Sequence, residues 1–268
     1  MKTTRKILPA LAMLLVSAIM LSTASYAWFA SNSKVTANDM HVKVKANTKF
    51  LEISLDKDAE QYKSGVTIGN TLGADDGFEL VHAKFDSATE PDTLAWYTGS
   101  SDNREDYKGT TGGLNDAPLA FGGDLTIDRY ALVNTVYVRM SPTSDTALEK
   151  LRIDTTATSV AGVDGAAITD KLIEALRILV VATPVGGGAA VGAQIYDAAG
   201  TTKGVTSYNA EAGDYLVKEV TLGTTYQVDI YIYYDGEDSS AFTNNAGSLQ
   251  EVVVNVGFIA GPEEAVSP

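Results

Sequence analysis

Apolar and polar residues alternate along much of this chain, and the longest run of this kind spans residues 226–234. Every second position in it is apolar or aromatic: Tyr226, Val228, Ile230, Ile232 and Tyr234. The positions between them are polar or carry a tyrosine hydroxyl that tolerates water: Gln227, Asp229, Tyr231 and Tyr233. A period of two predicts a β-strand with one face in the core. Residues 252–258 repeat the pattern, so we expect the two strands to bury Val228, Ile230, Ile232, Val252, Val254 and Val256.

Shorter alternating segments, bounded by Gly, Asp and Asn, bring the total to about ten strands. They lie at 40–44, 51–55, 78–85, 132–140, 148–153, 177–185, 193–196 and 215–222. The first two are expected to form an N-terminal hairpin around a turn at 46–49, and the near-continuous apolar run at 177–185 indicates a central, doubly buried strand. Because strands and helices do not alternate, the pattern predicts an all-β fold, namely an antiparallel β-sandwich of jelly-roll or immunoglobulin-like type.

Two segments depart from this pattern. Ile168, Leu172 and Leu176 recur every four residues behind Thr169 and Asp170, which can cap a helix, so one short helix is expected there. Residues 98–124 are rich in glycine and lose the periodicity, which predicts a long loop. A mobile insertion is the simpler interpretation of this loop, and a binding loop on a rigid scaffold is the alternative.

The N-terminus has the three parts of an export signal. Lys2, Arg5 and Lys6 precede an uncharged apolar run from residue 7 to about residue 21, and the small-x-small sequence ending at Ala27 follows. Cleavage by signal peptidase after Ala27 would make Trp28 the new N-terminus. An uncleaved membrane anchor is the alternative, but the run is shorter than the roughly 20 apolar residues that a span needs.

These features divide the chain into a signal peptide at 1–27, an N-terminal arm at 28–38, a single β-sandwich domain at 39–260 and a flexible tail at 261–268. The arm carries four apolar residues: Trp28, Phe29, Val35 and Ala37. Val35 and Ala37 are odd-numbered, whereas the apolar positions of the next strand are even-numbered, so a bend or bulge is expected near 38–39. A freed arm could complete the sheet of a neighbouring copy as a donor strand. The alternative is that it folds back on its own sheet.

Charge and cysteine content limit the partners and the compartment. Twenty basic against 34 acidic residues give a net charge of −14, and loss of the three basic residues of the signal would leave 17 against 34, or −17. Such a surface repels nucleic acid and anionic membrane, so no nucleic-acid partner is expected. The chain has no cysteine, which excludes a disulfide framework and a thiolate metal site.

Two stretches resemble a known family. The junction Ala-Ser-Tyr-Ala-Trp-Phe-Ala at 24–30, with its polar arm and Met-His-Val-Lys-Val at 40–44, is similar to the camelysin/TasA-like group of secreted bacterial surface proteins. The strands at 229–238 and 252–258 provide the second match. The resemblance implies a β-sandwich subunit of an extracellular or cell-surface biofilm-matrix fibre, with itself and other matrix or cell-surface components as partners. A secreted binding module for glycan or a surface protein is the alternative function.

No motif supports an enzyme. The S-x-x-K and S-D-N fragments at Ser31 and Ser101 lack the K-T-G element that completes the penicillin-recognising set. The glycines at 186–188 do not fit G-x-G-x-x-G. His41 and His82 are the two histidines, and neither belongs to an H-E-x-x-H pair. The protease activity attached to the camelysin branch is therefore not carried over, and no catalytic residue or cofactor is expected.

Two further groups have a binding interpretation beside a structural one. The acidic turn at Asp235, Glu237 and Asp238 could hold Ca²⁺, which prefers carboxylate oxygens, but an Asp-Gly turn is also an ordinary solvated hairpin signal. The solvated turn is favoured. Trp96 and Tyr97 beside the long loop could form a sugar-stacking platform. Because adjacent residues of a strand point to opposite faces, we expect at least one of them to pack in the core instead.

Overall fold

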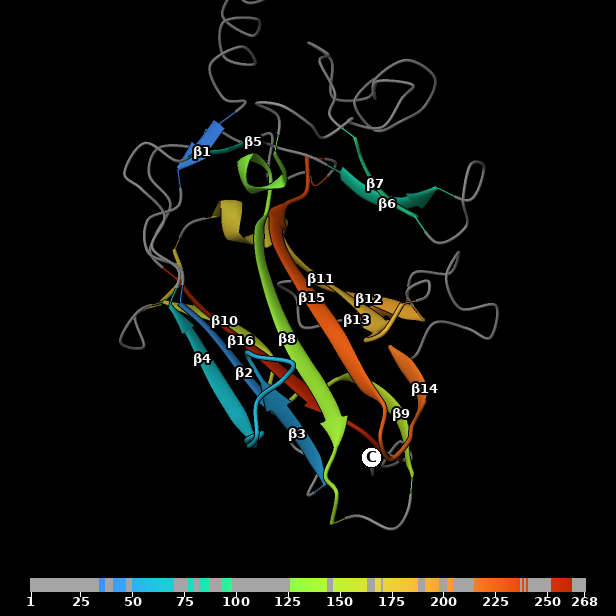
Figure 1. The fold of residues 1–268 in the computed structure, drawn as a ribbon. Coiled ribbons are helices and arrows are strands. Elements are labelled where there is room, and N and C mark those ends of the chain that lie inside the picture. Colours follow the sequence, from blue (N-terminus) through green and yellow to red (C-terminus); the bar gives the residue numbers. More distant parts are fainter. Residues whose placement is uncertain are drawn as a thin grey trace, which may run out of the picture.

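In the computed structural model (Figure 1), the regular secondary structure of the described part of the chain is almost entirely β-strand. The described residues are 34–36, 41–46, 50–69, 77–79, 82–86, 93–97, 126–143, 147–162, 167–169, 171–187, 191–197, 202–204, 215–236, 238, 240 and 252–261. They form two six-stranded sheets and two small two-stranded sheets. None of the helices found among these residues is long and apolar enough to cross a membrane.

The front sheet in Figure 1 is antiparallel throughout. Its strands, in spatial order, are β13 (Thr202–Gly204), β12 (Gly192–Asp197), β11 (Leu176–Pro184), β15 (Thr225–Tyr234), β8 (Leu132–Met140) and β3 (Leu51–Ser54). The predicted central position of the apolar run at 177–185 is confirmed, because β11 lies between β12 and β15 and is buried on both faces.

The back sheet contains one parallel pair. Its order is β14 (Val217–Val220), β9 (Leu148–Ile153), β16 (Val252–Ile259), β2 (His41–Ala46) and β4 (Gly65–Gly69), and β10 (Ser159–Gly162) also pairs with β16. The N-terminal strand β2 runs parallel to the C-terminal strand β16, with Val42 beside Val254. The expectation of a purely antiparallel fold was therefore wrong, because alternation shows which face of a strand is buried but not the direction of its neighbour.

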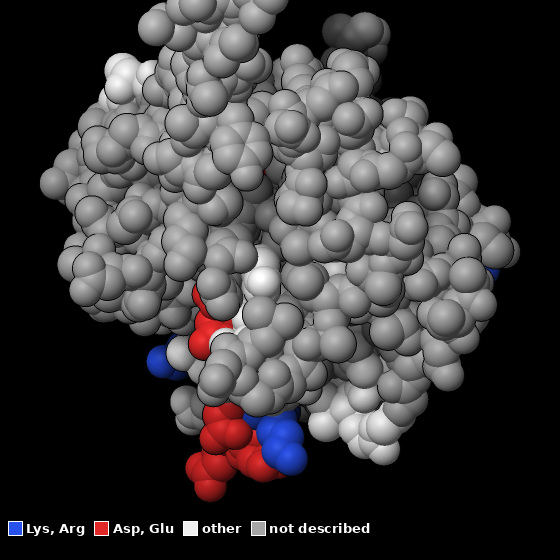
Figure 2. All heavy atoms as spheres, turned by 90° about the horizontal axis from the view of Figure 1, so that it is seen from above, with Lys and Arg blue, Asp and Glu red and all other residues white. Residues whose placement is uncertain are grey.

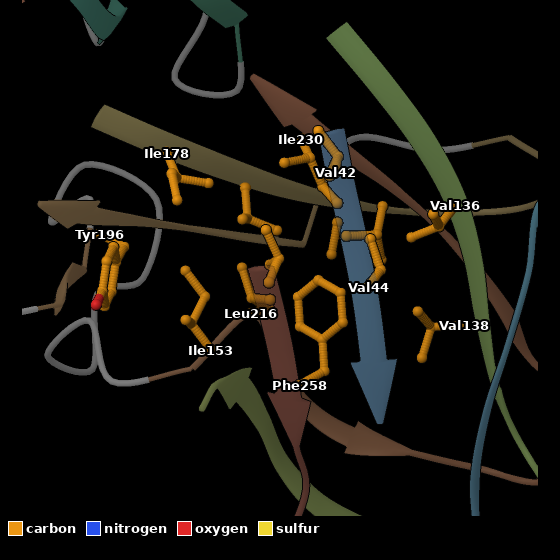
Figure 3. Close-up of a cluster of buried hydrophobic side chains, with 14 of the residues drawn as sticks. Val42, Val44, Val136, Val138, Ile153, Ile178, Tyr196, Leu216, Ile230 and Phe258 are labelled. Atoms are coloured by element: carbon orange, nitrogen blue, oxygen red, sulfur yellow. The ribbon is translucent and has the colours of Figure 1, made fainter. Parts of the chain in front are cut away.

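One apolar core fills the space between the two sheets (Figure 3). Val42, Val44 and Phe258 enter it from the back sheet, while Val136, Val138 and Ile230 enter it from the front sheet. The six core positions expected from alternation are confirmed, since each is at most 1% exposed: Val228, Ile230, Ile232, Val252, Val254 and Val256. Removing this much apolar surface from water is the main source of stability for a cysteine-free chain.

The predicted N-terminal hairpin does not form. β2 belongs to the back sheet and β3 to the front sheet, so the two strands lie in different sheets and do not pair with each other. Both strands bury their apolar residues on the same core by this route, for example Val44 and Ile53. A second expectation was also wrong: residues 78–85 are not one strand but parts of β5 (Gly77–Glu79) and β6 (His82–Asp86), which lie in different small sheets.

Two contacts join the sheets at their margins. On one side, the backbone groups of Ile53 and Lys63 exchange hydrogen bonds of 2.7 and 2.8 Å. On the other side, buried Gln194 on β12 accepts a 2.8 Å hydrogen bond from the backbone N–H of Ile153 on β9. Each contact satisfies a backbone group at a place where the regular strand pairing stops.

A second apolar cluster covers part of the outer face of the front sheet. β6 pairs with β7 (Thr93–Tyr97), and Trp96 from β7 packs on Tyr231, Tyr233 and Leu179 of the front sheet. Two short 3₁₀ helices, η1 (Ile127–Arg129) and η3 (Lys171–Ala175), lie at the same end. The second of these lies within the helix predicted at 168–176, but it is a five-residue 3₁₀ helix, and Leu176 already belongs to β11. The predicted loop at 98–124 lies outside the described residues.

Candidate functional site

The described part of the N-terminal arm forms a small sheet of its own. β1 (Lys34–Thr36) pairs antiparallel with β5, and the register places Lys34 opposite Glu79 and Val35 opposite Phe78. Three residue pairs make up this ladder. In the single chain, residues 34–36 of the arm therefore pair with β5 of the same chain.

The β1–β5 ladder is a sheet of its own, separate from the β2–β4 pairing. His41 lies seven positions after Lys34, whereas Glu79 lies ten positions after Gly69, the partner of His41. The segment between β4 and β5 is therefore three residues longer than the segment between β1 and β2. The bend predicted near 38–39 lies outside the described residues.

The described part of the arm lies at one end of the two large sheets. β2 and β16 run in the same direction, so their first residues lie at the same end of the sheet. β1 comes just before β2 in the sequence, whereas Gly261, the last described residue, comes just after the end of β16. Figure 1 places β1 and β5 at the upper end. The N-terminal arm and the last described residue therefore lie at opposite ends of the two sheets.

β4, the terminal strand of the back sheet, carries a second feature relevant to assembly. The N–H of Ala46 donates to the carbonyl of Ser64 at 2.8 Å, so the backbone groups of Val66 and Ile68 also face β2 and those of Gly65 and Thr67 face the other way. Beyond the bridge from Lys63 to Ile53, none of the described strands pairs with this outer edge. It can accept an added strand.

Ala27, Trp28, Phe29 and Ala37 lie outside the described residues, as do Ser31 and Ser101 of the enzyme-like fragments. Val35 is the one predicted donor residue within β1. His41 lies in β2 and His82 in β6.

The acidic turn after β15 is bound by an arginine that sequence reasoning did not identify. Arg177 forms ion pairs with Asp235, at 3.6 Å from Nε to Oδ2, and with Asp238. Its Nη1 also donates to the backbone carbonyl of Glu174 at 2.7 Å. A guanidinium thus stands beside two of the three predicted cation ligands, and Glu237 lies outside the described residues. The sequence contained one signal for this contact, because Arg177 is the single charged residue in the otherwise apolar run at 177–185.

Asp238 is ionised more easily than a free aspartate. Burial by itself would raise its pKa, but the hydrogen bonds from Ser240 and the contact with Arg177 outweigh burial and hold the pKa below the ordinary value of 3.8. The backbone N–H of Ser240 donates to Asp238 Oδ1 at 2.9 Å. No group of three or more potential metal ligands occurs among the described residues.

Trp96 and Tyr97 do not form an exposed platform. Trp96 is 3% exposed and Tyr97 is 4% exposed. The ring centroids of Trp96 and Tyr231 lie 5.6 Å apart, and those of Trp96 and Tyr233 lie 5.1 Å apart. The expectation that at least one of the two adjacent aromatics packs in a core is confirmed.

No protein-family model, curated protein or solved structure matches this chain.

Proposed function

We propose that this protein is a structural subunit of an extracellular surface or biofilm-matrix fibre, and that copies join by exchanging the N-terminal arm. The observation that supports the proposal most directly is the ladder of three residue pairs between β1 and β5. It is short and separate from both large sheets. Opening it leaves the pairs of the large sheets intact, so its cost is small compared with that of unfolding.

Exchange would re-form the same pairs between two copies. β1 of one subunit would take the place of β1 on β5 of the next, and the longer arm could extend along the free edge of β4. If donation goes in one direction only, each subunit keeps a free acceptor, and the contact propagates as a filament. If two copies exchange arms reciprocally, they close into a dimer.

Export is part of the proposal. Cleavage after Ala27 would expose Trp28 and Phe29 at the terminus of the arm, and such apolar residues are stabilised when a partner buries them. We also assign the two facing sheets to the β-sandwich class, of jelly-roll or immunoglobulin-like type. The mass of the exported protein tests the first step, because a mature chain must begin at Trp28.

The charge of the chain predicts how assembly depends on salt. With a net charge of −14, copies repel each other at low ionic strength, and added salt screens this repulsion. Seen from the end that carries β1 (Figure 2), Asp and Glu side chains with neighbouring Lys or Arg side chains project at one rim. Fibres are expected to form more readily at about 0.5 M than at about 0.01 M monovalent salt.

Cysteine pairing provides a direct test, since the chain has no cysteine of its own. Val35→Cys is introduced in one preparation and Phe78→Cys in another, because these positions face each other in the β1–β5 register. Mixing under oxidising conditions should yield a disulfide-linked pair of chains if the arm exchanges. Lys43→Cys mixed with Thr67→Cys is the matched control, since those residues pair in the β2–β4 ladder and should stay unlinked between chains.

The doubly substituted chain, with Val35→Cys and Phe78→Cys together, tests the link to fibres. An internal disulfide should hold the arm on its own β5 and abolish fibres in negative-stain microscopy, and reduction should restore them. Fibres that persist with the internal disulfide formed would show that arm exchange does not drive assembly. Absence of fibres in all states of the wild-type chain would overturn the proposed function itself.

A further inference from the structure

The outer face of the front sheet carries a row of polar side chains that none of the preceding functions uses. The cross-strand register aligns Tyr137 on β8, Gln227 on β15 and Thr183 on β11 in one line. One step along the strands, Thr135 lies opposite Asp229. All five side chains are half-buried, so they keep part of their surface open to solvent. We refer to these five residues as the polar row.

The centre of the polar row is a carboxylate held in a fixed orientation. Thr135 Oγ1 donates to Asp229 Oδ1 at 2.6 Å, and Gln227 Nε2 donates to Oδ1 at 3.1 Å and to Oδ2 at 3.0 Å. Within the described part of the chain, Asp229 has no ion-pair partner. Two neutral neighbours therefore orient the carboxylate without neutralising it, and Oδ2 can accept a further hydrogen bond.

Aromatic side chains flank the polar row at both ends. Arg139 lies over the ring of Tyr62, with 3.8 Å between its Cζ and the ring centroid, next to Thr225 on β15. At the other end Trp96 packs on Tyr231. Six residues of strand, or about 20 Å, separate Thr225 from Tyr231. Asp229 and Gln227 lie between these two covered ends.

Tyr231, two residues along the strand from Asp229, is partly shielded from water by Trp96. Burial, and secondarily the charge of Asp229, raise the pKa of the neighbouring Tyr231 to about 12. Hydrogen bonds made in such surroundings are stronger than those made in open water. Residues on rigid strands also lose little conformational entropy when a ligand binds.

We propose that the polar row binds a neutral polysaccharide chain. Sugar hydroxyls can donate to the oriented carboxylate of Asp229 and accept from the hydroxyls of Tyr137 and Thr183, while the ring of Tyr137 offers an apolar surface to a sugar face. Anionic polymers are disfavoured, because the row contains a carboxylate and no cation, and the chain carries a net charge of −14. This inference is independent of arm exchange.

The proposal is tested by affinity electrophoresis of the mature chain. The gels contain a soluble β-glucan, dextran, mannan or chitosan-free chitin oligosaccharides. At least one neutral polymer should retard the wild-type chain, and Asp229→Ala and Tyr137→Ala should each weaken retardation at least tenfold. Asp58→Ala is the matched control, since it removes an exposed carboxylate in the turn after β3. Circular dichroism verifies that each variant folds. If Asp229→Ala does not fold, the retardation of Tyr137→Ala tests the proposal.

Three results would overturn the proposal. One is the absence of retardation by every neutral polymer, and another is equal retardation of the wild-type chain and the folded Tyr137→Ala variant. The third concerns a further gel that contains polylysine. If polylysine retards the chain, no neutral polymer does, and Asp229→Ala and Asp58→Ala weaken this retardation equally, the pattern indicates general attraction of cations to an acidic surface.

Discussion

Trp96 meets Tyr233 edge to face, with ring centroids 5.1 Å apart and an interplanar angle of 85°. This arrangement directs the positive edge of one ring at the negative face of the other. Through it the two-stranded sheet β6–β7 covers a face of the front sheet that alternation alone had assigned to solvent. Tyr233 is consequently 2% exposed.

Trp96→Ala should lower the free energy of unfolding by about 3–5 kcal/mol, the range for a large buried aromatic. Urea denaturation followed by circular dichroism measures the change. Thr67→Ala, at an exposed position of β4, should stay within about 0.5 kcal/mol of wild type. A loss below about 1 kcal/mol in Trp96→Ala would show that β7 does not pack on the front sheet in solution.

Ile230→Ala tests the main core. Ile230 is fully buried between the two sheets, so the substitution should cost about 2–5 kcal/mol. Its chain neighbour Asp229 lies on the opposite face and accepts two side-chain donors, so Asp229→Ala should cost about 1 kcal/mol. Thermal unfolding of the two variants compares them, and equal losses would contradict the strand register.

The Arg177–Asp238 contact predicts a defined dependence on pH. The pKa of Asp238 is lower in the folded chain than its ordinary value of 3.8. The contact therefore stabilises the fold fully above about pH 3.8, and this contribution disappears as pH falls through the lower folded pKa. Asp238→Asn should destabilise the chain by about 1–3 kcal/mol at pH 7 and by much less near pH 2.

Denaturant titrations of wild type and Asp238→Asn across this pH range measure the difference. Arg177→Gln should reproduce the loss at pH 7, and the two substitutions together should cost less than their sum, because they remove one shared contact. A difference between wild type and Asp238→Asn that stays constant down to pH 2 would contradict the assignment.

Gly257 lies where a side chain has no room. A Cβ built on it would be 2.5 Å from the Cβ of Ala157 and 3.3 Å from that of Asp154, in the turn that joins β9 to β10. Gly257→Ala should therefore cost about 1–3 kcal/mol by overpacking. Adding Ala157→Gly should recover part of this loss in thermal unfolding. If the second substitution only adds further destabilisation, the close approach is not the cause.

Alternation alone was sufficient to predict the strands of the core. β8, β9, β11, β12, β15 and β16 were placed within a few residues, and inward side chains were correctly identified on β15 and β16. Burial of one face requires an apolar residue at every second position, and this requirement is local, so it is visible in a single segment. The short strands β1, β4, β7, β10 and β13 were missed because three to five residues contain too little of the pattern.

The tertiary structure alone decided which strands meet. A period of two does not distinguish a parallel from an antiparallel neighbour, or one sheet from the other. The pairing of β2 with β16 and the crossing from β2 to β3 follow from packing both ends of the chain on one core. The same holds for the candidate sites: Arg177 reaches Asp238, and Thr135 reaches Asp229, across 61 and 94 residues of sequence. Contacts over such separations depend on the assembled sheets, because no local preference of the chain specifies them.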